Sequence, residues 1–141
     1  MAHFNKVGLL ILNLAHPQFL VCEKNHFTSD YIMPGGKYES GENDAQCLQR
    51  ELREELGVEV DTLTIEFIGE YTDVAAGDPT KDVCVQLYTG ILAGVPSPCG
   101  EIVRLHWIGV NDQNNLRVSP LIRNKILPDL IARGILVAPT V

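Results

Sequence analysis

Residues 35–58 read GGKYESGENDAQCLQRELREELGV, and the rest of the chain is best understood outward from this stretch. A glycine-bearing loop comes first, and a helical pattern expected over 44–56 follows it. Asn43 suits the N-cap of that helix, and Gln46 three residues later completes the pattern of a capping box. Gly57 suits the position just after the helix, where a left-handed backbone is needed. Local signals therefore define both ends of one helix.

The expected helix has two different faces. At about 100° per residue, Glu51, Glu54 and Glu55 fall on one side. The neighbouring arc is apolar and carries Ala45, Leu48, Leu52 and Leu56. Like charges at i and i+4 repel, so Glu51 and Glu55 need compensation. Mg²⁺ prefers carboxylate and carbonyl oxygens, and the acidic face predicts a site for such an ion.

The segments on either side mix strands with one further helix. Strands are expected in 5–15, 18–24, 31–33, 58–72, 83–93 and 101–108, and loops at 73–82 and 94–100. Ser119-Pro120 reads as the start of the last helix, which runs to about Arg133-Gly134. Pro128 lies inside this helix and should kink it or split it. The pattern predicts an α/β (α+β) fold, a mixed sheet with helices packed on it, in one domain spanning 1–141.

Composition restricts the function. Lys and Arg number 11 and Asp and Glu 18, so the net charge is −7. That charge argues against a partner bound through nucleic-acid phosphates. It leaves open a phosphate-bearing small molecule whose charge is met by metal ions.

The cysteines and apolar runs indicate a cytoplasmic protein. Cys22, Cys47, Cys84 and Cys99 form no C-x-x-C pair, so reduced thiols in a cytosol are expected. Residues 7–15 resemble a short signal-peptide core, but Asn13 stands where a small residue is needed, so a buried strand is favoured. No apolar run reaches the roughly 18 residues of a membrane span, and no membrane partner is expected.

The stretch at 36–58 resembles the Nudix box. The matching residues are Gly36, Glu42, Arg50-Glu51-Leu52, Glu54-Glu55 and Gly57-Val58, with Pro34-Gly35, Lys37, Glu39 and Gly41 also similar to MutT-type members. Resemblance to the Nudix hydrolase family implies an α/β/α sandwich. It also implies a hydrolase that uses Mg²⁺ or Mn²⁺ while water attacks a phosphorus of a nucleotide's diphosphate linkage.

The resemblance also implies roles for individual residues. Metal ligands would come from the three acids and the glycine pair: Gly35, Gly36, Glu51, Glu54 and Glu55. Arg50 would hold a glutamate in orientation through a charge-assisted contact, and Lys37 would reach a phosphate.

The general base and the base-binding surface are less defined. Family members use either the glutamate equivalent to Glu51 or an acid from a downstream loop, for which Glu101 is the best candidate. Weaker candidates lie in the expected loop at 73–82: Asp73, Asp78 and Asp82. Tyr31 and Phe27 are candidates to stack on a nucleobase, although aromatic residues among strands more often belong to a core.

The expected substrate is a nucleoside triphosphate, cut to the monophosphate and pyrophosphate. An ADP-sugar or another nucleoside diphosphate derivative is the alternative, although Asp73 stands where members acting on ADP-ribose tend to carry proline. A non-catalytic nucleotide-binding module is a further alternative, but such relatives usually lack box acids. The apolar segment 135–138 suggests a strand or an interface, which leaves a homodimer open.

Overall fold

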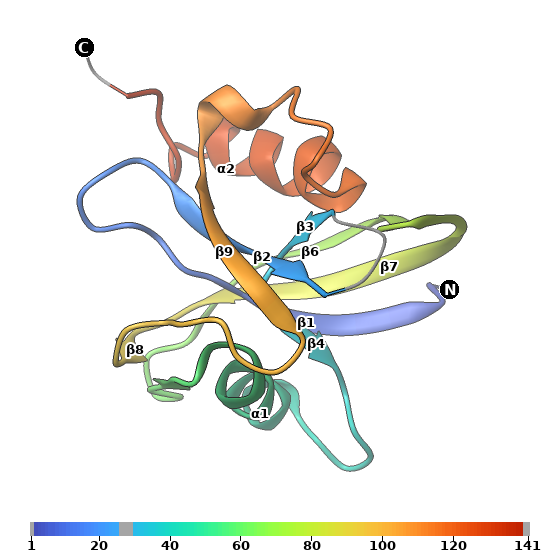
Figure 1. Ribbon diagram of the computed structural model, residues 1–141, viewed down its shortest axis with the longest axis vertical. Coiled ribbons are helices and arrows are strands. Elements are labelled where there is room, and N and C mark those ends of the chain that lie inside the picture. The colour runs from blue at the N-terminus through green and yellow to red at the C-terminus, as the bar shows by residue number, and fades with distance from the viewer. Residues whose placement is uncertain (1, 26–29, 140–141) are drawn as a thin grey trace.

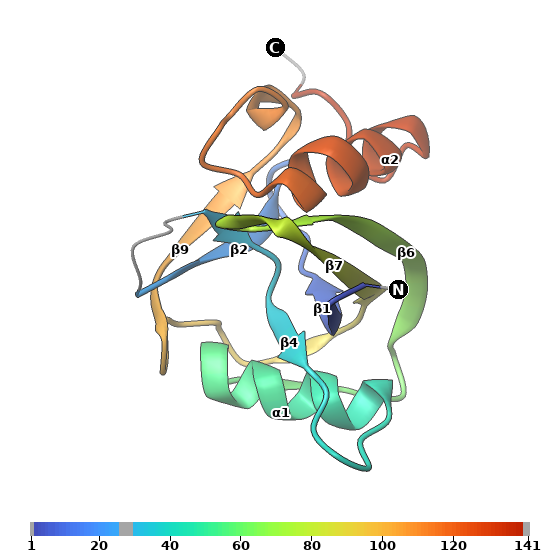
Figure 2. The same ribbon diagram turned by 90° about the vertical axis from the view of Figure 1, so that its right-hand side faces the viewer.

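The computed structural model describes residues 2–25 and 30–139, and in it the chain forms three layers. Helix α1 (Asp44–Leu56) covers one side of the strands, and helix α2 (Leu127–Ala132) covers the other (Figures 1 and 2). The expected mixed sheet flanked by helices is confirmed.

Four strands make the larger sheet. In spatial order they are β4 (Gly35–Lys37), β1 (Phe4–Leu10), β7 (Asp78–Thr89) and β6 (Glu66–Ala75). β1 and β7 are parallel, whereas β4 and β6 pair antiparallel with their neighbours. The register sets Gly36 opposite Val7, so the glycine pair of the box is itself an edge strand of this sheet.

A second, antiparallel sheet lies beside the first. Its order is β3 (Tyr31–Ile32), β2 (Phe19–Lys24) and β9 (Ile102–Ile108), and a short pair joins β5 (Glu59–Val60) to β8 (Leu92–Ala93). The runs at 5–15 and 18–24 therefore enter different sheets, with only an isolated bridge between Leu12 and Phe19. Alternation along β2 buries Leu20 against α1 and Val21 against the C-terminal helix, which gives the sheets a core on each face.

Helix α1 has the bounds that its caps predicted. The Asn43 side chain accepts the Gln46 N–H, the Gln46 side chain accepts the Asn43 N–H, and Gly57 ends the helix at φ 64°. Leu48, Leu52 and Leu56 are fully buried along the opposite stripe. Burying each such leucine contributes roughly 1.5–3 kcal/mol, which fixes how α1 lies on the sheet.

The segment expected as a loop at 73–82 is instead a hairpin. β6 and β7 remain paired until Ala75 faces Asp78, and Gly77 makes the turn at φ 75°. The polar residues misled the prediction because these strand ends project into solvent, where polarity does not prevent pairing. The hairpin is the long ribbon at the right of Figure 1.

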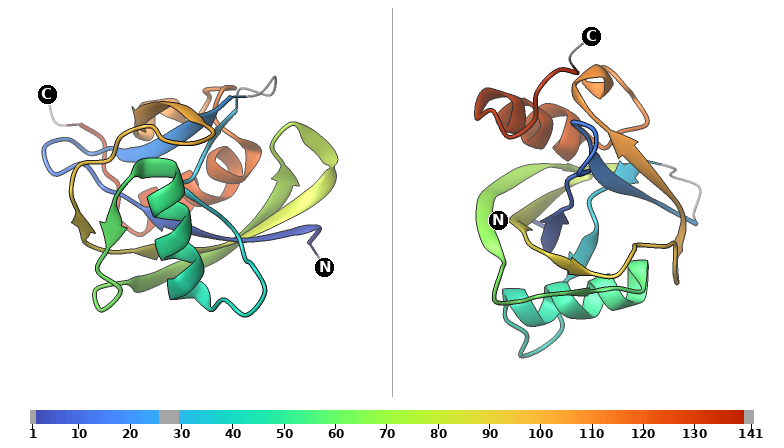
Figure 3. Two further views of the ribbon diagram at one scale, coloured as in Figure 1. Left: turned by 60° about the horizontal axis from the view of Figure 1, so that its bottom comes forward. Right: turned by 90° about the vertical axis from the view of Figure 1, so that its left-hand side faces the viewer.

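The C-terminal helix is disturbed at Pro128, as expected, but it widens into a π-helical turn and is not split in two. After a short 3₁₀ turn η1 (Val110–Asp112), the chain forms a widened π-helical turn η2 (Ile122–Ile126) that leads directly into α2. Proline donates no backbone hydrogen bond, and its ring clashes with the carbonyl four residues earlier, so the helix widens just before it. Figure 3 shows this helix and α1 on opposite sides of the strands. None of the helices in the described residues is long and apolar enough to cross a membrane.

Candidate active site

The acidic face of α1 lies directly against the glycine pair of β4. A Cβ atom on Gly36 would lie within 2.6 Å of the carboxylate carbon and both carboxylate oxygens of Glu51. Gly35 adopts φ 135°, and a Cβ there would collide with the backbone of Val7. Glycine is therefore required at Gly35, whereas a side chain at Gly36 would displace the Glu51 carboxylate that now lies against the strand.

Glu55 is the most buried of the box acids, with 6% of its surface exposed. Its Oε1 accepts the Gly35 N–H at 2.9 Å. Burial raises its pKa to about 7, although that hydrogen bond and the nearby Lys24 act in the opposite direction. Burial also raises the pKa of Glu51, against the effect of Arg50. For both carboxylates, the effect of burial on the pKa exceeds that of the nearby positive charges.

Arg50 is the centre of the surrounding charge network. Its Nε and Nη2 donate to the two oxygens of Glu42 at 2.7 and 2.9 Å, a bidentate contact that lowers the Glu42 pKa to about 2. Nη2 also donates to the Lys37 carbonyl at 2.9 Å, and Nη1 donates to Glu51 at 3.0 Å. Arg50 thus contacts the loop, the strand and one box acid at once.

Glu54 differs from the other two acids because its side chain is 58% exposed and meets Arg50 only at 3.4 Å. Across residues 2–25 and 30–139, no three His, Cys, Asp or Glu side chains are already gathered to hold an ion. The donors nevertheless fit a hard cation, because they are carboxylate oxygens, and burial raises the pKa of both Glu55 and the half-buried Glu51.

The loop after β8 brings Glu101 to the same place. The Cys99 N–H donates to the Glu55 carbonyl at 2.9 Å, so the loop covers the C-terminal end of α1. Glu101 follows directly, with an 80% exposed side chain whose Oε2 lies 3.8 Å from Lys24 Nζ. Glu101 therefore lies near the C-terminal end of α1, in contact with a lysine that lines the cavity.

The other sequence candidates lie elsewhere. Asp73 accepts from Asn124 beside the C-terminal helix, and Asp78 accepts from Thr80 within the hairpin. The Tyr31 ring stacks on His106 at 4.1 Å instead of lining the cavity that Ile32, its neighbour in β3, helps to form. Phe27 lies outside the described residues.

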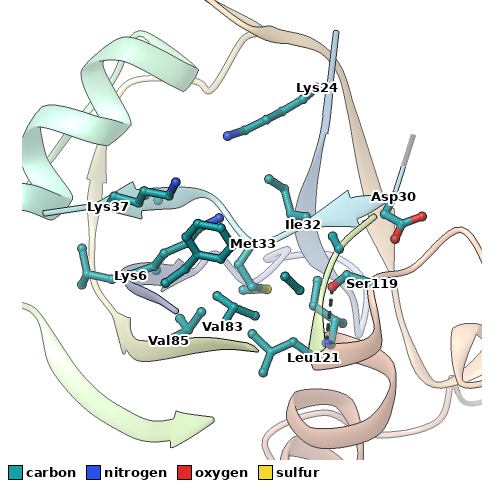
Figure 4. A pocket seen from close by; sticks show the side chains of 18 residues that line it. Lys6, Lys24, Asp30, Ile32, Met33, Lys37, Val83, Val85, Ser119 and Leu121 are labelled. Carbon is teal, nitrogen blue, oxygen red and sulfur yellow. Dashed lines mark hydrogen bonds between the residues drawn. The ribbon is translucent and has the colours of Figure 1, made fainter. Parts of the chain in front are cut away.

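A cavity of about 310 Å³ begins at the glycine pair (Figure 4). Lys6, Lys24 and Lys37 line its charged part, next to Gly35 and Gly36. The remaining wall is largely apolar and includes Ile32, Met33, Val83, Val85 and Leu121. A cavity with a charged end at the carboxylates and an apolar remainder suits a phosphorylated organic molecule.

Two of these lysines were not recognised in the sequence. Lys6 interrupts the apolar run at 5–15, and this was the available signal, since a lysine inside a buried strand needs a reason. Burial, together with the neighbouring Lys24 and Lys37, lowers its pKa to about 8, although Glu55 and Glu51 act in the opposite direction. Lys24 ends β2 and gave no such signal.

Comparisons with known proteins agree with the geometry. The family model described as NUDIX domain matches residues 2–130. The MutT protein of Methanosarcina mazei Go1 superposes with a TM-score of 0.72 at 20% identity, over 94% of each chain. The E. coli ORF135 protein gives 0.70 at 23% identity, covering 93% of this chain and 90% of its own. The MutT NUDIX hydrolase of Burkholderia pseudomallei gives 0.62 at 18%, covering 74% and 81%. No curated protein sequence matches the chain.

Proposed function

The chain belongs to the Nudix hydrolase family, which makes it a hydrolase of phosphoanhydride bonds, and we propose that its substrate is a nucleoside triphosphate. In this proposal a divalent cation, Mg²⁺ or Mn²⁺, is required. The products are the nucleoside monophosphate and pyrophosphate.

One observation carries the proposal. Two carboxylates of α1, Glu51 and Glu55, face the glycine pair, and that pair lines a cavity that three lysines also line. Carboxylates supply ligands for a cation, and the lysines supply charge for phosphate oxygens.

The chain's own residues would hold the reacting groups in place. The Gly35 N–H fixes Glu55, and Arg50 orients Glu51 while tying the loop to β4. When bound, the cation would neutralise phosphate oxygens and make a bound water more acidic. Either Glu51 or Glu101 would accept the proton of the attacking water.

The test is a panel of nucleotides assayed for released phosphate or pyrophosphate with Mg²⁺ and, separately, with Mn²⁺. It includes ordinary and oxidised nucleoside triphosphates and an ADP-sugar, the alternative substrate class. Turnover of a triphosphate to monophosphate and pyrophosphate is expected. Absence of turnover on every compound with both ions would overturn the proposal and favour a nucleotide-binding module.

A second measurement separates the two base candidates. Glu51→Gln and Glu101→Gln are compared for rate and for affinity toward Mn²⁺. The base is the residue whose replacement lowers the rate more while leaving metal affinity intact. The cytoplasmic location and the homodimer stay predictions from the sequence.

A further inference from the structure

Helix α1 is joined to the neighbouring strands by polar contacts on two of its sides. On the side of β4, Glu55 accepts the Gly35 N–H, and Arg50 donates to a carbonyl of the same strand. Both of these contacts are made by residues of the candidate active site. On the side of β5, the contact comes from Gln49, which is not among the residues that line the cavity of Figure 4.

The Gln49 side chain holds the backbone of Val60 by two hydrogen bonds. Its Nε2 donates to the Val60 carbonyl and its Oε1 accepts the Val60 N–H, both at 2.8 Å. The amide therefore pairs with β5 on the edge that β8 leaves free, as a further strand would. Val60 is 2% exposed, so an apolar residue in place of Gln49 would leave two buried backbone groups without their partner.

These two bonds restrict the rotation of α1 about its own axis. The leucines of α1 are buried, but apolar burial is not directional, whereas a pair of hydrogen bonds requires the helix to present Gln49 at one angle. At about 100° per residue, Gln49 lies about 160° from Glu51 around the helix, so it holds the side opposite the acids. A carboxylate about 6 Å from the helix axis moves by about 1 Å when the helix turns by about 10°.

We infer that Gln49 is a positioning residue, which sets the rotation of α1 at which Glu51, Glu54 and Glu55 bind one cation together. The inference rests on the proposed function and extends it to a residue outside the cavity. Gln49 acts through the helix and supplies no ligand of its own. Loss of its contact displaces the carboxylates, which weakens metal binding and slows the reaction although every ligand is still present.

The test measures the affinity for Mn²⁺ by titration calorimetry in the absence of nucleotide, so that turnover does not contribute. Gln49→Met, which keeps the length of the side chain and removes both hydrogen bonds, is expected to weaken Mn²⁺ binding about fivefold and to lower kcat/KM about tenfold. Gln49→Asn keeps the amide but does not reach Val60, and should behave as Gln49→Met does.

All titrations are made at a temperature at which circular dichroism shows each variant to be folded, so a loss of stability alone does not change the measured affinity. Unchanged Mn²⁺ affinity in the folded Gln49 variants would overturn the inference, as would failure of the wild type to bind Mn²⁺.

Arg53→Met is the matched control, because Arg53 also joins α1 to β5. Its Nε donates to Glu59 Oε1 at 3.0 Å, but both side chains are 57% exposed. An exposed ion pair contributes little and does not fix one helix angle, so Arg53→Met should bind Mn²⁺ as the wild type does. A loss of affinity in Arg53→Met equal to that in Gln49→Met would also overturn the inference, since the effect would then not be specific to Gln49.

The two measurements separate failure of the positioning role from failure of the proposed function. An enzyme that turns over nucleotides, but whose Mn²⁺ affinity is the same in Gln49→Met, would refute the role of Gln49 and leave the function standing. A protein that turns over no nucleotide, but whose Mn²⁺ affinity falls in Gln49→Met and not in Arg53→Met, would refute the function and leave the positioning role standing.

Discussion

Two charge clusters on this fold are opposite in composition. In the box cluster, one guanidinium is shared by four carboxylates: Arg50 meets Glu39, Glu42, Glu51 and Glu54. In the Glu23 cluster, one carboxylate is shared by three basic side chains: Glu23 meets Arg104, His106 and Arg117. Each cluster has one buried or half-buried centre and several partners of the opposite sign.

The clusters differ in how their surroundings shift the pKa values of their carboxylates. Glu23 is 7% exposed, and the hydrogen bond with His106, aided by the two arginines, holds its pKa below the usual range. Glu55 is buried and Glu51 is half-buried, and both have pKa values above the usual range. Glu23, whose charge is balanced by its basic partners, connects β2 to β9. Buried carboxylates short of positive charge indicate a site for a ligand that brings it.

If the two clusters differ in function, removing a carboxylate from the box cluster should have the largest effect on activity. Glu54→Gln should lower kcat/KM by about 10³-fold, because a lost metal ligand is worth about 4 kcal/mol in the transition state. The fold should persist because the Glu54 side chain is 58% exposed. The measurement is steady-state kinetics together with Mn²⁺ affinity.

Glu66→Gln is the matched control, since it makes the same change at an exposed position on β6. Near-wild-type activity in Glu54→Gln, with a normal Glu66→Gln, would show that Glu54 is no metal ligand and that the acidic face has another role.

Arg50 should matter less than the acids that it orients. Arg50→Lys keeps one charge but cannot make the bidentate contact with Glu42 or donate to Glu51 and the Lys37 carbonyl together. A loss of 10–100-fold in kcat/KM is expected, with weaker Mn²⁺ binding.

The double variant Arg50→Lys with Glu42→Gln should lose less activity than the two single losses combined, because both act through one contact. Fully additive losses would mean that Arg50 acts on the site without Glu42.

The Glu23 cluster should affect stability rather than activity. Because the folded-state pKa of Glu23 lies below the ordinary 4.5, its contribution to stability is present above that value and is lost as pH falls through the folded value. At pH 7, Glu23→Gln should melt at a lower temperature than the wild type, and the difference should shrink below pH 4. Thermal melts over this pH range, with Glu66→Gln as control, measure it.

Turnover by Glu23→Gln should stay close to that of the wild type at a temperature where both are folded. A large loss of activity without a loss of stability would place the Glu23 cluster in the active site and remove the contrast between the two clusters.

What could be predicted from the sequence was local in character. The ends of α1 follow from Asn43 and Gly57, and its buried stripe follows from leucines at helical spacing. The disturbance in the last helix, a π-helical turn just before Pro128, follows from that proline. In each case the signal and the structure that it causes lie within a few residues of one another.

What could not be predicted depends on contacts between distant segments. Lys6 and Lys24 line one cavity although their strands belong to different sheets. The residues next to each lysine in the chain do not predict that the two side chains meet. The hairpin at 73–82 needed its partner strand to be known, since its polar residues read as a loop. Likewise, the face of β3 on which a side chain lies depends on how two sheets meet.

Tyr31 tests which face of β3 a side chain lies on, and its replacement should have the smallest effect. The sequence suggested that it stacks on a nucleobase, whereas its ring stacks on His106 at 4.1 Å and on the Arg117 guanidinium at 4.8 Å. Tyr31→Leu should lower the melting temperature by about 2–4 °C, since an aromatic stack contributes about 1 kcal/mol. Because the side chain lies outside the cavity, KM should change by less than about twofold.

Tyr31→Phe keeps the stack and should match the wild type in both measurements. A large rise in KM for Tyr31→Leu, with KM unchanged in Tyr31→Phe, would mean that the ring turns to the substrate after all and that the Glu23 cluster borders the nucleotide site.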